Sequence, residues 1–145
     1  MNACERRVRA AVIQTLRDTS HAPPTAAITA SLGASDAEVA AALHLLADAH
    51  RLVLIPGTDS VWMAHPFSAV ATDFLVRIGD RHWFANCVWD GLSILALLGD
   101  GTLDTHSPAS DELIRLHVSA GKVLGDTLVH FLVPARRFWD DIGFT

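Results

Sequence analysis

The chain has 145 residues, half of them hydrophobic, which suffices for the core of one domain or of two small domains that share a core. A formal net charge of −5 argues against broad affinity for nucleic acid or anionic membranes. The sequence shows no apolar run of membrane-spanning length, no signal peptide and only two, distant cysteines, so we expect a cytoplasmic protein with reduced thiols.

The first 65 residues have the pattern of three helices followed by a β-hairpin. Apolar residues recur at helical spacing, His21 to Pro24 is a break, and Ser35 with Glu38 forms a capping box. The predicted elements are helices over residues 4–18 and 25–32, a helix that begins at Ser35, and strands over residues 51–55 and 60–64. This order predicts a winged-helix-like module over residues 1–65.

A winged helix raises the alternative of a DNA-binding regulator, whose third helix would read the bases. The exposed face of that helix offers Asp36, Glu38 and Asp48. The helix itself contains no arginine or lysine, and the first cation after it is Arg51. Because phosphate contacts supply most nucleic-acid affinity, we expect no nucleic-acid partner and a structural module instead. We expect its helices to pack against the second part of the chain through Val39, Leu43 and Leu46 or their neighbours.

Residues 66–145 predict a small mixed β-sheet with one buried helix, so the fold class is α+β. The predicted strands are residues 74–78, 81–85, 102–105, 112–118 and 127–133. An apolar helix from Cys87 to Leu98, stopped by Gly99, should be buried nearly all round. Residues 136–141 predict a short helix or turn.

Cys87 and Asp90 lie three residues apart, where the strand pattern gives way to the helical one. A spacing of i and i+3 places thiol and carboxylate on one helix face, and the helix dipole favours a thiolate at its N-terminus. Cys87 should then react faster than Cys4 near neutral pH, and Asp90 could take its proton. The alternative is that Cys87 is a small buried hydrophobe and Asp90 an ordinary helix-start residue.

The segment Phe84-Ala85-Asn86-Cys87-Val88-Trp89-Asp90-Gly91-Leu92, followed by Leu97-Leu98-Gly99, resembles the catalytic segment of the organomercurial (alkylmercury) lyases. That family shows an aromatic-Ala-x-Cys-x-x-Asp-Ala-Leu run. His65-Pro66-Phe67-Ser68 and Val129-His130-Phe131 resemble further landmarks, and the similarity extends from about Pro24 to the end. The resemblance implies protonolysis of carbon–mercury bonds, with Cys87 and Asp90 as catalytic residues that contact the mercury of the substrate. It implies no cofactor, a small organometal substrate, low-molecular-weight thiols as co-reactants and a role in metal resistance.

Two departures from the family pattern concern cysteines. The resemblance places a second cysteine near residues 125–128 and a further one in residues 105–108, where Ser107 is the nearest match. Half of the expected dithiol clamp is therefore missing, and the alternative is a non-catalytic binder or sensor of soft metals. A further hypothesis is that the natural chain continues past Thr145 with a cysteine or selenocysteine, which would supply the missing ligand.

Several aromatic residues and histidines are candidates for an apolar substrate pocket. They are Trp83, Trp89, Trp139, His130 and Phe67, of which the tryptophans and His130 could equally be ordinary core residues. His65, before Pro66, is expected to be a turn residue. The eight histidines show no H-x-x-x-H pair or compact group with the cysteines that would indicate zinc.

Overall fold

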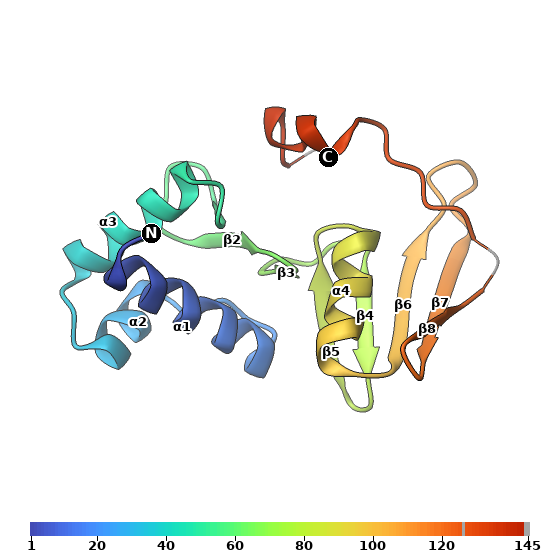
Figure 1. Cartoon of the computed structure of the whole chain (residues 1–145), viewed down its shortest axis with the longest axis horizontal. Helices are drawn as coiled ribbons and strands as arrows, with labels where there is room; N and C mark the ends of the chain where they lie inside the picture. The colour runs from blue at the N-terminus through green and yellow to red at the C-terminus, as the bar shows by residue number, and fades with distance from the viewer. Residues whose placement is uncertain (126, 144–145) are drawn as a thin grey trace.

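Strands from both parts of the chain form a single antiparallel sheet in the computed structural model, which describes residues 1–125 and 127–143 (Figure 1). The α-helices are α1 (Ala3–Thr19), α2 (Thr25–Leu32), α3 (Asp36–Asp48) and α4 (Val88–Leu98), and η1 (Ala135–Asp140) is a 3₁₀-helix. The strands are β1 (Val53–Leu54), β2 (Val61–Ala64), β3 (Phe67–Ser68), β4 (Leu75–Ile78), β5 (Arg81–Ala85), β6 (Gly101–His106), β7 (Leu113–Ser119) and β8 (Lys122–Leu124). The predicted α+β fold is confirmed.

The N-terminal helices form where their caps and apolar spacing predict them. The Ser35 side chain accepts the Glu38 backbone N–H and the Glu38 carboxylate accepts the Ser35 N–H, so the predicted capping box is present. Gly33 ends α2 with φ +61°, in the left-handed region that glycine adopts without a steric cost. The apolar faces of α1 and α3 are buried against each other.

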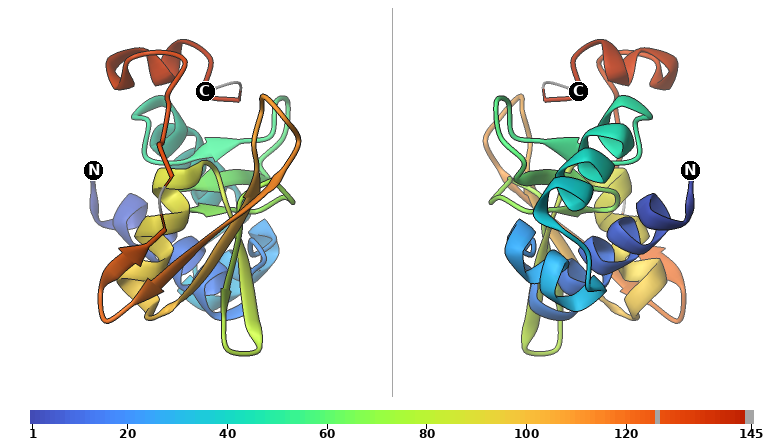
Figure 2. Two further views of the ribbon diagram at one scale, coloured as in Figure 1. Left: turned by 90° about the vertical axis from the view of Figure 1, so that its right-hand side faces the viewer. Right: turned by 90° about the vertical axis from the view of Figure 1, so that its left-hand side faces the viewer.

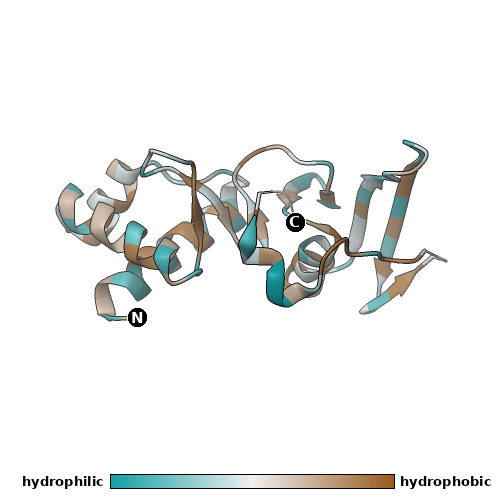
Figure 3. Ribbon diagram, turned by 90° about the horizontal axis from the view of Figure 1, so that it is seen from above, coloured by the Kyte–Doolittle hydropathy of each residue, from teal (hydrophilic) through white to brown (hydrophobic). Residues whose placement is uncertain are grey.

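The sheet has the order β1-β2-β3-β5-β4-β6-β7-β8, and all its described pairs are antiparallel, whereas the sequence predicted a mixed sheet. The hairpin strand β2 pairs with β3, and β3 pairs with β5 through Phe67 and Ala85. The hairpin therefore continues directly into the sheet that supports α4. Hydrophobic and hydrophilic residues alternate along β7, as expected for a strand with one covered face (Figure 3).

Contacts between the N-terminal helices and the second part run mainly through α1. Trp83 Nε1 donates to the Arg17 carbonyl at 2.9 Å, and the Arg81 guanidinium donates to the Asp18 carbonyl at 3.1 Å. Arg81 also lies over the Trp83 ring, 4.5 Å from its centroid. The apolar face of α3 packs mainly on α1, α2 and β1, so the first module meets the second part chiefly through α1.

Helix α4 packs on β4, β5 and β6 with one face only. Trp89 is 64% exposed and Leu97 67% exposed, so the prediction of burial nearly all round is wrong. Its sequence is apolar on both faces, and hydrophobic periodicity therefore did not distinguish the covered face. No helix in the described part of the chain is long and apolar enough to cross a membrane.

The segment after β8 runs back past α4 toward the N-terminal helices (Figures 1 and 2). The strand predicted over residues 127–133 is absent, because an extended segment becomes a strand only where another strand accepts its hydrogen bonds. The short helix predicted near residues 136–141 is present as η1. Its Trp139 ring stacks on His50 with centroids 4.1 Å apart.

Candidate active site

Cys87 is the N-cap residue of α4, two residues after the inner strand β5 ends at Ala85. Its backbone is extended, with φ −153° and ψ 180°, and the helix begins at Val88. Asp90 therefore occupies the third helical position, so the two residues are related as N-cap and N3 rather than along one helix face. The Asp90 carboxylate is near enough for its charge to affect the thiol.

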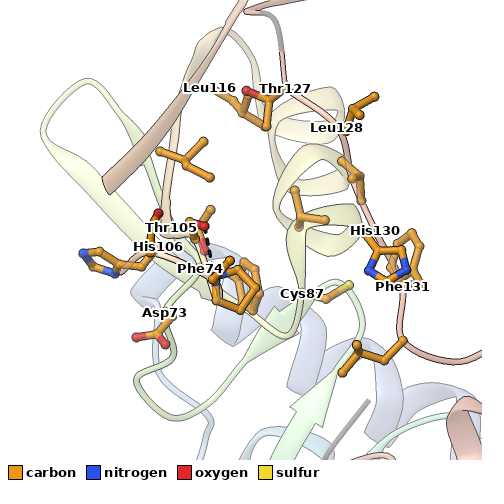
Figure 4. Close-up of a pocket in the computed structure, with 18 of the residues that line it drawn as sticks. Asp73, Phe74, Cys87, Thr105, His106, Leu116, Thr127, Leu128, His130 and Phe131 are labelled. Atoms are coloured by element: carbon orange, nitrogen blue, oxygen red, sulfur yellow. Dashed lines mark hydrogen bonds between the residues drawn. The ribbon is translucent and has the colours of Figure 1, made fainter. Parts of the chain in front are cut away.

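The thiol borders a cavity of about 680 Å³. One wall consists of strand and loop residues and the other of the segment after β8. Lining residues include Phe74, Thr105, His106, Leu116, residues 127–133 and Phe138. Figure 4 shows the Cys87 sulfur directed toward the side that carries His130 and Phe131. A mostly apolar cavity with one thiol is suited to a small organic group bound to a soft metal.

Burial raises the pKa of the Cys87 thiol above its ordinary value. The backbone N–H groups of Asp90 and Trp89 lower this pKa in part, and the charge of the Asp90 carboxylate raises it further. These N–H groups do not form a capping hydrogen bond with the Cys87 side chain, so they offset the effect of burial only in part. The pKa shift therefore runs opposite to the predicted preference for a thiolate, because burial and a neighbouring negative charge outweigh the N–H groups at the helix start.

The Asp90 carboxylate is held by two side chains that the sequence did not predict as site residues. Asn86 Nδ2 donates to Asp90 Oδ2 at 2.8 Å, and His65 Nδ1 lies 3.1 Å from the same oxygen. Asn86 comes from the link between β5 and α4, whereas His65 comes from the link between β2 and β3. Asn86 could have been proposed as a site residue from sequence, because it is the direct neighbour of Cys87. No spacing pattern connects His65 with Asp90.

The candidate pocket residues fall in different places. His130 lines the main cavity, and Trp89 lines an adjoining groove of about 370 Å³, with its ring 5.9 Å from that of Phe131. Trp83 and Phe67 are 2% and 3% exposed in the core and line neither cavity, so the structure does not bring them to the site. Trp139 contacts His65 instead, edge to face, at 6.0 Å.

A sequence model of the alkylmercury lyase family, MerB, matches residues 67–145, just over half of the chain. The chain belongs to the alkylmercury lyase family. A solved structure described as the mercury-bound form of MerB2 superposes with a TM-score of 0.67 at 21% identity, which shows a shared fold. The match covers 86% of this chain and 60% of that one, so this chain spans less than two thirds of its length. No curated protein matches.

In this lyase-family chain, the places where the resemblance puts further cysteines border the Cys87 cavity. Thr105, His106, Ser107 and Thr127 all line it, so hydroxyl and imidazole groups stand where thiols are expected. Asp126 and the chain beyond Thr145 lie outside the described residues. Among the residues described, no group of three or more His, Cys, Asp or Glu side chains could hold a metal ion, and Cys4 belongs to α1.

Proposed function

We propose that this chain cleaves the carbon–mercury bond of small organomercurials, with Cys87 as the mercury-binding thiol and Asp90 as the proton carrier. The observation that carries the proposal is the juxtaposition of these two residues at the start of α4, where the thiol borders a cavity of about 680 Å³. Family membership supports the same reaction.

The reaction divides into capture and protonolysis. The Cys87 sulfur forms a bond to mercury while its proton passes to the Asp90 carboxylate. Asp90 then donates that proton to the carbon bound to mercury, and the electron pair of the breaking carbon–mercury bond becomes the new carbon–hydrogen bond. The hydrocarbon leaves, and mercury(II) remains on the Cys87 sulfur.

Product release requires another soft ligand, since mercury(II) binds thiolates in preference to the hydroxyl groups of Thr105 and Ser107. We propose that low-molecular-weight thiols supply it and remove the metal. Such thiols are abundant and reduced in the cytoplasm, where the activity would contribute to metal resistance. His130 is proposed as a wall of the substrate pocket, and Trp89 as a wall of the adjoining groove.

The test is benzene release from phenylmercury in the presence of excess small thiol. Wild-type protein should turn over, and Cys87→Ser should neither bind the mercurial nor release benzene. Asp90→Asn should still bind phenylmercury but lose release by about 10²–10⁴-fold, because only protonolysis needs the carboxyl proton. Undiminished release from Asp90→Asn would remove Asp90 from the mechanism.

A second candidate function is non-catalytic binding of soft metals through Cys87. The observation that favours it is that the described part of the cavity offers one thiol only. A binder would take up one phenylmercury per chain and release no benzene, so the same experiment separates the two functions.

A further inference from the structure

The Asp90 carboxylate is anchored at one of its two oxygens. Both partners found for it among the described residues, Asn86 Nδ2 at 2.8 Å and His65 Nδ1 at 3.1 Å, lie at Oδ2. The Asp90 side chain is only 16% exposed, so little water competes for these contacts. Neither of these two contacts occupies Oδ1, and the carboxylate cannot rotate without breaking both.

The orientation of the Asn86 amide is set by its hydrogen bond to Asp90. Its Oδ1 atom is buried and has no hydrogen-bond partner in the described part of the chain, which is an unfavourable state for a carbonyl. A flipped amide would place this carbonyl against the carboxylate oxygen. The contact with Asp90 therefore fixes the amide, at the expense of an unpaired oxygen.

The His65 ring is held from a second side. The Trp139 ring meets it edge to face at 6.0 Å, and the same Trp139 stacks on His50 at 4.1 Å. His65 also lies 3.3 Å from Asn86 Nδ2, so the three polar side chains form one compact group. A ring restrained by an aromatic neighbour positions its partner more precisely than a free side chain would.

We propose that His65 and Asn86 are positioning residues that hold Oδ2 of Asp90, so that Oδ1 remains available for proton transfer between Cys87 and the substrate carbon. This inference rests on the proposed lyase function. It assigns a role in catalysis to two residues outside the Cys-x-x-Asp segment, one of which comes from the hairpin side of the sheet.

The test compares binding with bond cleavage in variants at position 65. His65→Leu should keep phenylmercury binding within about twofold and slow single-turnover benzene release by about 10–100-fold, since misplacing a reacting group by about 1 Å costs rate and not affinity. His65→Gln, whose amide can still donate to Oδ2, should recover most of the rate. His44→Leu is the matched control, because it removes an exposed His–Asp contact of 2.7 Å far from the cavity.

Asn86→Ala provides the same comparison if His65→Leu does not fold, as judged by thermal melting. Unchanged release in His65→Leu would overturn the proposal. Equal losses in His65→Leu and His65→Gln, or loss of binding together with release, would overturn it as well, because these results indicate a structural role.

A spectroscopic arm separates this inference from the proposed function. The ¹⁵N signals of the His65 ring should shift in Asp90→Asn and stay unchanged in Asp59→Asn. If the wild type releases no benzene, the lyase proposal fails, while shifted His65 signals would still support the fixed Asp90 geometry. Unchanged His65 signals in Asp90→Asn would overturn the positioning, whatever the activity.

Discussion

Burial and the charge of the Asp90 carboxylate raise the pKa of the Cys87 thiol above its ordinary value. Alkylation of Cys87 by iodoacetamide should therefore be slow near neutral pH and should still increase above about pH 8.5, where an ordinary thiol is half ionised. Asp90→Asn should shift this profile to lower pH, since it removes a negative charge beside the sulfur. Peptide mapping across a pH series measures the rate, and a profile that levels off below pH 8 would contradict the expectation.

Asp104 forms ion pairs that should contribute to the stability of the folded protein. Hydrogen bonds from Arg115, at 2.6 and 2.7 Å, and the charge of Arg77 hold the pKa of this buried carboxyl below its usual range. A pKa that is lower in the folded state gives stability above about pH 3.9, which is lost as the pH falls through the folded value. Asp104→Asn should lower the free energy of unfolding at pH 7 by about 1–3 kcal/mol. Urea titrations at pH 7 and at about pH 3 should show this difference shrinking, and a constant difference would argue against a charge effect.

The sequence could predict Cys87 and Asp90 because they are close along the chain and belong to one helix start. It could not predict His65, because folding alone brings the end of β2 beside α4. The sign of the Cys87 pKa shift was also beyond prediction, since it depends on how deeply the sulfur is buried, whereas its position at the helix start favoured the opposite sign.

Gly101 is the first residue of β6, where the chain re-enters the sheet after the end of α4. A Cβ atom there would be 2.1 Å from the Arg77 carbonyl oxygen, a backbone atom that cannot move without disturbing the pairing of β4 with β6. Gly101→Ala should therefore destabilise the protein by about 2 kcal/mol or more and lower the melting temperature by roughly 4–8 °C. Ser119→Ala, at the exposed end of β7, is the control. Equal melting temperatures for the two variants would contradict this close approach.

At the level of elements, alternation and caps predicted most helices and inner strands correctly. The pattern failed for residues 127–133, a mainly apolar run that finds no strand to pair with. Residue type sets the tendency to extend, whereas hydrogen-bond partners distant in sequence decide whether a strand forms.

The continuous sheet joins the two predicted domains, 1–65 and 66–145. Helix α1 also hydrogen-bonds to β5 through Trp83 and shares one hydrophobic core with it. Deleting residues 1–60 would expose Trp83 and the buried face under α1. The remainder should therefore aggregate or elute as large particles on size exclusion. A soluble, folded fragment from residue 66 onward would show that the first module is an independent attachment.

The outer surface of α3 carries Asp36, Glu38 and Asp48, all of them exposed. Binding of the whole protein to random duplex DNA should be undetectable at roughly physiological salt, weaker than the ~10⁻⁴–10⁻⁶ M of typical non-specific binders. A gel shift at micromolar protein that disappears as salt increases would favour the winged-helix regulator.

The protonated state of Cys87 also bears on how long the site survives. Thiolates attack peroxide and disulfides much faster than thiols do, so a cysteine with a raised pKa should be oxidised slowly to sulfenic acid or to a mixed disulfide. In the proposed mechanism a mercurial would still react, because formation of the sulfur–metal bond would displace the proton onto the adjacent carboxylate. A raised thiol pKa would then favour reaction with a soft metal over reaction with an oxidant, and would protect the cavity thiol until the metal binds.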